Sequence, residues 1–233
     1  MTITVRPSEA RGHANHGWLE THHSFSFAGY YDPGHMGFRS IRVINDDIVR
    51  RGTGFATHGH RDMEIVSYVV RGALEHKDST GGHSVLARGD VQHMSAGTGL
   101  RHSEYNASRQ NDVRFLQIWI EPEREGLSPS YDQATFPDVA KCNRLFLIAA
   151  PGGMDGALPI RQDARIYASL LGSGNSVRHG LAAGRAAWVQ VVDGSIGVNG
   201  RTLSSGDGAA IESIDVITIT AETPAEFLLF DLA

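Results

Sequence analysis

The chain has a single cysteine, Cys142, among its 233 residues. One cysteine excludes an intrachain disulfide and any metal site built from several thiolates, and it agrees with a reducing compartment. We therefore expect Cys142 to have a structural role.

Long hydrophobic runs and basic clusters are also missing. No stretch of about 18 uncharged apolar residues occurs, and the segment MTITVRPSEARGH lacks the apolar core of a signal peptide. The net charge is -5, the pI is near 6.2, and Arg50-Arg51 is only a basic pair. These features give no reason to expect export, membrane spanning or direct binding of nucleic acid. We expect a folded, soluble, cytoplasmic protein, and a monomer.

Three widespread enzyme motifs are absent as well. The sequence contains neither a G-x-x-x-x-G-K-[ST] phosphate loop nor a G-x-G-x-x-G fingerprint, so nucleotide cofactors are not indicated. It also lacks the G-x-S-x-G elbow, which leaves a serine hydrolase unsupported. The chemistry must therefore be sought among other side chains.

Short β-branched and aromatic runs, separated by turn residues, dominate the chain. Glycine is abundant at 27 residues and few segments show a helical period, which is typical of an all-β sandwich or barrel. The strands that we expect cover residues 41–46, 64–72, 73–79, 113–120, 144–150, 186–194, 195–200 and 216–221. The stretch 121–143 is rich in proline and charge and lacks alternation, which indicates a segment that crosses between two domains.

The second half of the chain looks like a degraded copy of the first. Residues 68–72 (YVVRG) match residues 190–194 (QVVDG), and a Gly-Asp pair follows each at nearly the same offset. We therefore expect two small antiparallel β-barrels of jelly-roll type packed together. Their ranges are an N-terminal domain over 1–122, a linker over 123–143 and a C-terminal domain over 144–233.

The histidines are confined almost entirely to the first half. Of the 12 histidines, eleven lie at or before position 102 and only His179 lies beyond it. The positions aligned with His58 and His60 fall near Gly180 and Ala182, which cannot bind a metal. Only the N-terminal barrel should therefore carry chemistry.

Two short motifs in that half could bring metal ligands together. His58 and His60, in GFATHGHRDMEI, are separated by one residue, so on a strand they share a face about 7 Å apart. His102 and Glu104, in GTGLRHSEYN, have the same spacing. Two such strands lying opposite each other would present three nitrogens and one oxygen to one ion, leaving two positions of an octahedron open. Imidazole and carboxylate suit Fe(II), Mn, Co, Ni, Cu or Zn, and the lack of thiolate argues against a closed structural zinc site.

Glu64 is an alternative to Glu104. It lies four residues after His60 and would share its face on an unbroken strand. It could bind the metal in place of Glu104, which we favour, or orient one of the histidines.

The remaining polar groups have simpler interpretations. An aromatic-rich arm packed over the barrel is favoured over a role at the mouth of the site for His13, His16, His22 and His23. Surface or turn positions are expected for His76, His83 and His93, and a turn for Asn45-Asp46-Asp47.

Three long runs resemble the pirin family of the cupin superfamily. They are HGWLETHHSFSFAGYYDPGHMGFRSIRVINDD, GFATHGHRDMEIVSYVVRGALEHKDSTG and RGDVQHMSAGTGLRHSEYN. The resemblance is strong over residues 10–122 and looser beyond them. It implies a bicupin fold with one divalent metal in the N-terminal barrel, iron first and Zn, Ni, Mn, Co or Cu as alternatives. The family's ligand pairs fall on His58, His60, His102 and Glu104, which supports Glu104 over Glu64.

The resemblance also implies a function. Bacterial pirins are associated with quercetin 2,3-dioxygenase activity, and eukaryotic pirins with iron-dependent transcriptional co-regulation. An acidic chain without a nuclear targeting cluster fits the first role better. The leading hypothesis is thus a dioxygenase that uses dioxygen to open the oxygen-bearing ring of a flavonol and releases carbon monoxide.

In that reaction Glu104 would accept the proton of the flavonol 3-hydroxyl at the metal. Inward apolar residues would hold the planar rings or simply form core: Phe55, Met63, Ile65, Met94 and Ile118. Two other hypotheses are a metal-dependent module that binds a regulatory partner, and a metal that only stabilises the fold.

Overall fold

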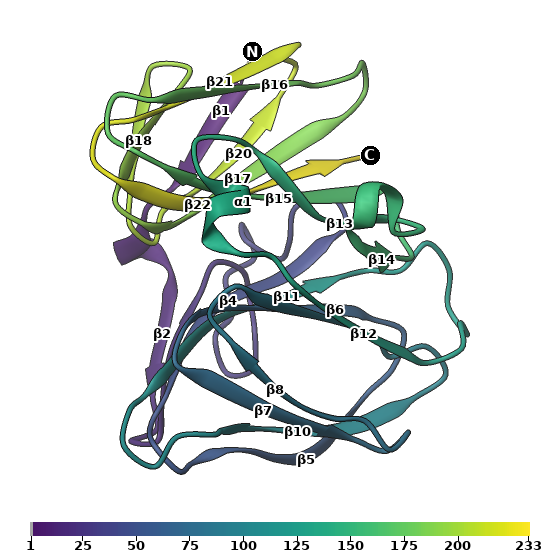
Figure 1. The fold of residues 1–233 in the computed structure, drawn as a ribbon. Coiled ribbons are helices and arrows are strands. Elements are labelled where there is room, and N and C mark those ends of the chain that lie inside the picture. The colour runs from purple at the N-terminus through teal and green to yellow at the C-terminus, as the bar shows by residue number, and fades with distance from the viewer. Residues whose placement is uncertain (1) are drawn as a thin grey trace.

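The computed structural model describes residues 2–233, which form two similar halves stacked on each other (Figure 1). In each half a seven-stranded sheet is paired with a four-stranded sheet. The predicted all-β class of jelly-roll type is confirmed. The predicted closed barrels are instead two-sheet assemblies, because the strands of the large and small sheets are not joined in one hydrogen-bonded ring.

The N-terminal half contains strands from the first 135 residues. Its large sheet has the order β12 (Ser130–Thr135), β9 (Asp90–Ser95), β6 (Glu64–Arg71), β11 (Val113–Ile120), β4 (Ile41–Val49), β3 (Leu19–His23) and β2 (Gly12–Asn15). Its small sheet has the order β5 (Gly54–His60), β10 (Leu100–Asn106), β7 (Ala73–Asp78) and β8 (His83–Ala87).

The C-terminal half repeats this arrangement. Its large sheet has the order β1 (Thr2–Arg6), β20 (Gly208–Glu212), β17 (Ala186–Asp193), β22 (Ala225–Leu232), β15 (Ala164–Leu171), β13 (Phe146–Pro151) and β14 (Leu158–Ile160). Its small sheet has the order β16 (Ser176–Gly180), β21 (Val216–Ala221), β18 (Ser195–Val198) and β19 (Arg201–Ser204).

Helices are short and peripheral. They are η1 (Ser8–Ala10), α1 (Asp138–Lys141) and η2 (Met154–Gly156). None of the helices within residues 2–233 is long and apolar enough to cross a membrane. Cys142, directly after α1, is exposed and forms no disulfide.

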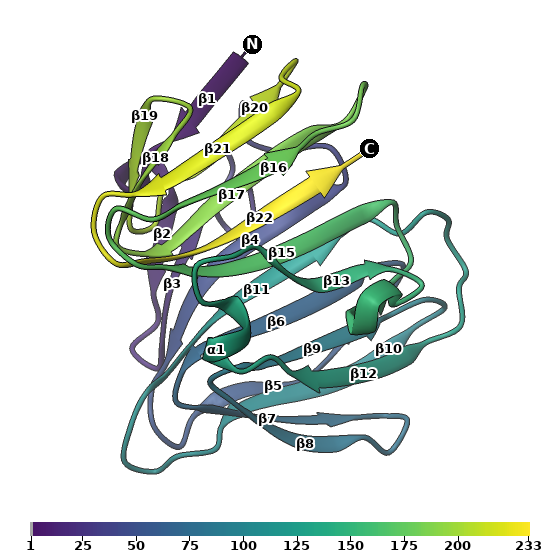
Figure 2. The ribbon, with the colours of Figure 1, turned by 45° about the horizontal axis from the view of Figure 1, so that its top comes forward.

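Each half takes its outermost strand from beyond the expected boundary. β1 starts the chain yet pairs with β20 of the C-terminal half, as Figure 2 shows at the upper edge of the molecule. β12 lies within the expected linker yet pairs with β9 of the N-terminal half. Within 123–143, which we expected to be a linker or crossing segment, Ser130–Thr135 thus forms a strand of the N-terminal half. Alternation fails there because β12 is an edge strand with no fully buried residue.

The two large sheets pack face to face around a shared apolar core. Ile44, Leu116 and Ile118 from the N-terminal half belong to the same buried cluster as Trp188 and Phe230 from the C-terminal half. The large sheet of the N-terminal half is thus covered on one face by the other half and on the other face by its own small sheet. Strands in such a layer are buried on both sides.

This double burial explains an error in the sequence interpretation. Asn45-Asp46-Asp47 was expected to be a turn, but these residues lie in the middle of β4 and are all buried. Asp46 points toward the interface between the halves, where Arg114 forms two hydrogen bonds with it, of 2.8 and 2.9 Å. Asn45 and Asp47, on the opposite face, point into the N-terminal half. Consecutive polar residues thus alternate between two buried faces.

Candidate metal centre

Three imidazoles converge where β5 and β10 pair. In this antiparallel ladder His58 lies opposite His102, and His60 lies opposite Leu100. One ligand nitrogen from each of His58, His60 and His102 lies within 4.8 Å of the others. The Nε2 atoms of His60 and His102 are 2.9 Å apart. The structure therefore brings together the three predicted histidines, because the pairing register puts both motifs at the same level of the sheet.

This geometry fits a divalent transition metal. Two imidazole nitrogens bound at right angles to one ion at 2.0–2.1 Å lie about 3 Å from each other. His58 donates a hydrogen bond from Nδ1 to the Ala56 carbonyl at 2.8 Å, so its Nε2 is free to bind. Burial, reinforced by the neighbouring imidazoles, lowers the pKa of His60 to about 4 and that of His102 to about 3. Both rings are therefore neutral at physiological pH, which is the form that binds metals.

A chain of hydrogen bonds orients His102 from behind. His76 donates from Nε2 to Asp78 Oδ2 at 3.0 Å, so its Nδ1 is left to accept. That Nδ1 is 3.4 Å from Nδ1 of His102, which places the proton of His102 on Nδ1 and leaves Nε2 free. Although burial acts in the opposite direction, hydrogen bonds from Thr80 and His76 lower the pKa of Asp78 to about 2. The expectation that His76 is a surface or turn residue was wrong, because it lies fully buried on the inward face of β7.

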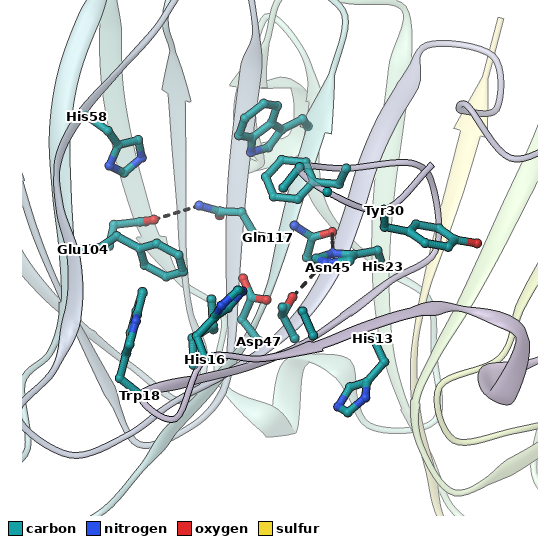
Figure 3. Close-up of a pocket in the computed structure, with 18 of the residues that line it drawn as sticks. His13, His16, Trp18, His23, Tyr30, Asn45, Asp47, His58, Glu104 and Gln117 are labelled. Carbon is teal, nitrogen blue, oxygen red and sulfur yellow. Dashed lines mark hydrogen bonds between the residues drawn. The ribbon is translucent and has the colours of Figure 1, made fainter. Parts of the chain in front are cut away.

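Glu104 faces the same cavity, but other side chains already hold it. Its Oε1 accepts hydrogen bonds from Gln92 at 2.7 Å and Ser67 at 3.2 Å. Its Oε2 accepts one from Gln117 at 2.8 Å, which is drawn in Figure 3. A carboxylate oxygen of Glu104 lies within 4.8 Å of ligand nitrogens of His76 and His102, in a grouping separate from that of His58 and His60. The donors fix the orientation of the carboxylate, and Oε2, which accepts one hydrogen bond, retains a free lone pair.

Glu64 has a different environment. Its oxygens accept hydrogen bonds from His93 at 2.7 Å, Ser95 at 2.6 Å and the Arg161 backbone at 3.0 Å. These bonds lower the pKa of Glu64 against the effect of its burial. It does not group with the three histidines. The partner His93 was expected at the surface and is 1% exposed, whereas His83 is exposed as predicted.

His58, His60 and Glu104 line a cavity of about 800 Å³, and His102 lies behind them. Aromatic residues dominate part of its wall, among them Trp18, Phe27, Phe55 and Trp119. Of the apolar residues that we expected to hold planar rings, Phe55 lines the cavity. Ile65 and Met94, with Met63 against them, pack in a separate cluster, and Ile118 lies in the core between the halves. The pleat turns Ile118 to the opposite face of the sheet, whereas Ile65 and Met94 share the face of Trp119 but do not line the cavity.

The N-terminal arm forms another part of the wall. His13, His16 and His23 line the cavity, so the role at the mouth of the site that we considered less favoured describes them better. His13 and His22 are cross-strand neighbours with stacked rings 4.6 Å apart, and Glu20 completes a second group of three possible ligands. This second group is more exposed than the first, which matches a solvated rim.

Sequence reasoning missed the polar residues that support the site. Ser67, Gln92 and Gln117 are buried on strands β6, β9 and β11, and all three contact Glu104. A signal was present, since each is a single amide or hydroxyl inside an otherwise apolar strand (EIVSYVV, DVQHM, RFLQIWI). A buried polar side chain needs a partner, so such isolated residues indicate a buried polar group nearby.

The residues of the C-terminal half that correspond to His58 and His60 lie one position earlier in the sequence than we expected. There β16 pairs with β21, and His179 lies opposite Ile217 as His58 lies opposite His102. The positions equivalent to His58 and His60 are therefore His179 and Leu181, rather than Gly180 and Ala182. His179 donates to Asp231 at 2.9 Å, and no ligand cluster occurs there among residues 2–233.

Comparisons with known proteins agree with this architecture. A profile of the pirin family matches residues 4–120, and a profile described as the quercetinase C-terminal cupin domain matches residues 147–232. Quercetin 2,3-dioxygenase of Escherichia coli is 47% identical over 230 residues, which cover 99% of this chain and 98% of that protein.

Solved structures give the same result. The crystal structure of YhhW from Escherichia coli has a TM-score of 0.96 at 46% identity, covering 100% of this chain and 98% of that one. The complex of bacterial pirin YhhW from Escherichia coli with nickel(II) has a TM-score of 0.95 at 46% identity, covering 99% of each chain. With matches to both of its halves and over its whole length, this chain belongs to the pirin family, whose fold is that of a two-domain cupin.

Proposed function

We propose that the protein is a metal-dependent dioxygenase that cleaves a flavonol such as quercetin, with ring opening and release of carbon monoxide. One observation supports this above all: three imidazoles cluster beside a large cavity with aromatic walls, and two of them line it together with the Glu104 carboxylate. A relative of 47% identity has the name quercetin 2,3-dioxygenase. Flavonols are planar polyphenols, and their shape and polarity suit such a wall.

His58, His60, His102 and Glu104 are the residues that we propose as metal ligands. A first-row divalent ion bound there would supply Lewis acidity, which favours the ionised form of the flavonol 3-hydroxyl. The donor set does not discriminate between iron and nickel. Nickel is the ion in the related Escherichia coli complex, so both metals belong in the test.

The protein's own contribution begins with Glu104. Its carboxylate is 1% exposed and is anchored by Gln92, Gln117 and Ser67. A base held in this way needs no reorientation to accept the proton of the 3-hydroxyl, provided that the substrate places that hydroxyl beside it. The aromatic walls orient the rings and exclude water from the ionised substrate.

The test is consumption of quercetin by the purified, metal-loaded protein, in air and under argon. We expect loss of flavonol absorbance that requires oxygen, with one carbon monoxide formed per flavonol consumed. Metal analysis of protein purified without added metal identifies the ion. His102→Ala should abolish turnover, and His179→Ala, at the position of the C-terminal half that is equivalent to His58, should not. Absence of oxygen-dependent loss with both iron and nickel would refute the proposed function.

A further inference from the structure

The cavity wall has polar groups besides the imidazoles and Glu104. Asp47 is 4% exposed, lines the cavity from the middle of β4, and its Oδ1 has no hydrogen-bond partner among residues 2–233. Figure 3 shows it between Glu104 on one side and the hydrogen-bonded pair His23 and Asn45 on the other. Asp47 thus brings to the cavity wall a buried carboxyl oxygen that no other group of residues 2–233 satisfies.

Trp119 contributes a second unpartnered atom to the same cavity. Its ring lies edge-on to His60 with 4.9 Å between ring centroids, and it lines the cavity. Its Nε1 is buried and has no hydrogen-bond acceptor within the described chain. A tryptophan N–H is a donor only, so this position calls for an acceptor on the ligand.

These two atoms stand out against a wall that is otherwise satisfied. Five buried side-chain polar atoms among residues 2–233 lack a partner, and two of the five line this cavity. Neighbouring polar groups on the wall do pair, since His23 Nδ1 lies 2.8 Å from Asn45 Oδ1 and Gln117 bonds to Glu104. Native proteins leave few buried polar atoms unpaired, and such atoms at a binding site are commonly reserved for a ligand.

The chemistry of Asp47 suits a phenol. Burial, and to a smaller extent the nearby carboxylates of Asp46 and Glu104, raises the pKa of Asp47 to about 7, against the effect of the Thr21 hydroxyl. Near neutral pH the group can therefore accept a hydrogen bond as a carboxylate or donate one as an acid. A hydroxyl group can match either form and can also accept from an indole N–H.

We propose that Asp47 and the Trp119 N–H are two separate contact points of a subsite that binds phenolic hydroxyl groups of the substrate other than the 3-hydroxyl. This inference rests on the proposed function and specifies its substrate class: flavonols hydroxylated on their outer rings rather than the bare flavonol skeleton. Asp47 and Trp119 are thus specificity-determining residues, separate from the residues that hold the metal.

The experiment compares two probes on four proteins. Quercetin carries ring hydroxyls, whereas 3-hydroxyflavone shares its 3-hydroxyl and 4-carbonyl but has no others. The proteins are the unmodified chain, Asp47→Leu, Trp119→Phe and Asp132→Asn; the last changes a carboxylate of β12 outside the cavity. The dissociation constant of each probe is measured under argon with the metal-loaded protein, and kcat/KM is measured in air.

We expect Asp47→Leu to weaken quercetin binding about 10- to 100-fold, the size typical of a buried hydrogen bond to a charged group. Trp119→Phe should give a smaller loss in the same direction. Binding of 3-hydroxyflavone should stay within about twofold in both variants, and Asp132→Asn should match the unmodified protein with both probes. If the ratio of the two dissociation constants is unchanged in Asp47→Leu and Trp119→Phe, the subsite is refuted.

Failure of the proposed function would look different. If the metal-loaded protein consumes neither probe in air, the dioxygenase proposal falls. The dissociation constants under argon still decide whether Asp47 and Trp119 recognise ring hydroxyls.

Discussion

The two halves of the molecule share one strand order and differ in what fills their interiors. Matching the ladders places His58, His60, His102 and Glu104 at the same positions as His179, Leu181, Ile217 and Ile219. Leu181, Ile217 and Ile219 belong to an apolar core of the C-terminal half. The same backbone thus surrounds a possible metal centre in one half and a packed core in the other.

The difference extends beyond the ligand positions. Ser67, Gln92 and Gln117, which hold Glu104, correspond in the ladders to Val189, Ala209 and Leu229. All three are fully buried in the apolar core of the C-terminal half. A buried carboxylate requires a layer of donors around it, so the four candidate ligands and their supporting residues form one unit.

His179 shows what a histidine does without that layer. It donates to the carboxylate of Asp231, which also accepts a hydrogen bond from Nε of Arg185. These bonds lower the pKa of Asp231 despite its burial. The histidine therefore belongs to a hydrogen-bond network with Asp231 at the position where the N-terminal half has His58.

The largest expected difference between the halves is the loss of bound metal when a histidine is replaced. His102→Ala should reduce the metal content to background, because it removes a central imidazole and leaves the hydrogen bond of His76 unmatched. His179→Ala should retain full metal content. Elemental analysis after dialysis against the same buffer measures both. Full metal content in His102→Ala, or its loss in His179→Ala, would place the centre elsewhere.

A metal-ligand side chain introduced into the apolar core of the C-terminal half should lower the free energy of unfolding. Ile219→Glu puts a carboxylate where Val189, Ala209 and Leu229 offer no donor, and we expect a loss of about 3–5 kcal/mol in the free energy of unfolding. The matched control Ile219→Val should cost only about 1 kcal/mol. Urea unfolding followed by circular dichroism measures both. A loss for Ile219→Glu as small as that of the control would show that the C-terminal half tolerates a buried charge.

A smaller effect concerns pH. The pKa values of His60 and His102, about 4 and about 3, lie below the ordinary 6.5. Between pH 6.5 and these lowered pKa values, the unfolded chain binds more protons than the folded chain. The stability of the metal-free protein therefore falls as the pH drops from 6.5 toward 4. Asp47, with its raised pKa of about 7, acts in the opposite sense over about pH 4 to 7.

A variant separates these contributions. His102→Gln retains Asp47 and removes one depressed imidazole, so we expect it to lose less stability than the unmodified protein between pH 7 and pH 5. Urea unfolding of the metal-free proteins at the two pH values measures the difference. Equal losses would mean that His102 does not resist protonation in the folded state.

Much of this architecture could be predicted from the sequence because local patterns have local causes. The spacing of His58 and His60, and of His102 and Glu104, puts each pair on one face of a strand wherever the strand lies. Strand segments such as Val113–Ile120 and Val216–Ala221 were located correctly from their β-branched and aromatic runs. The repeated glycine turns also indicated two similar halves.

The tertiary structure decided what local patterns leave open. Alternation does not tell which face of a strand is inward, and in a strand covered on both sides, such as β4, it disappears altogether. Hence Asp47 was mistaken for part of a turn, and buried His76 and His93 for surface residues. Only the pairing of β5 with β10, between segments 40 residues apart, put His102 beside His58. Glu64, on β6, is instead hydrogen-bonded to His93 and does not face the three histidines. Long-range neighbours depend on the whole fold, whereas the spacing of side chains along one strand depends on the backbone alone.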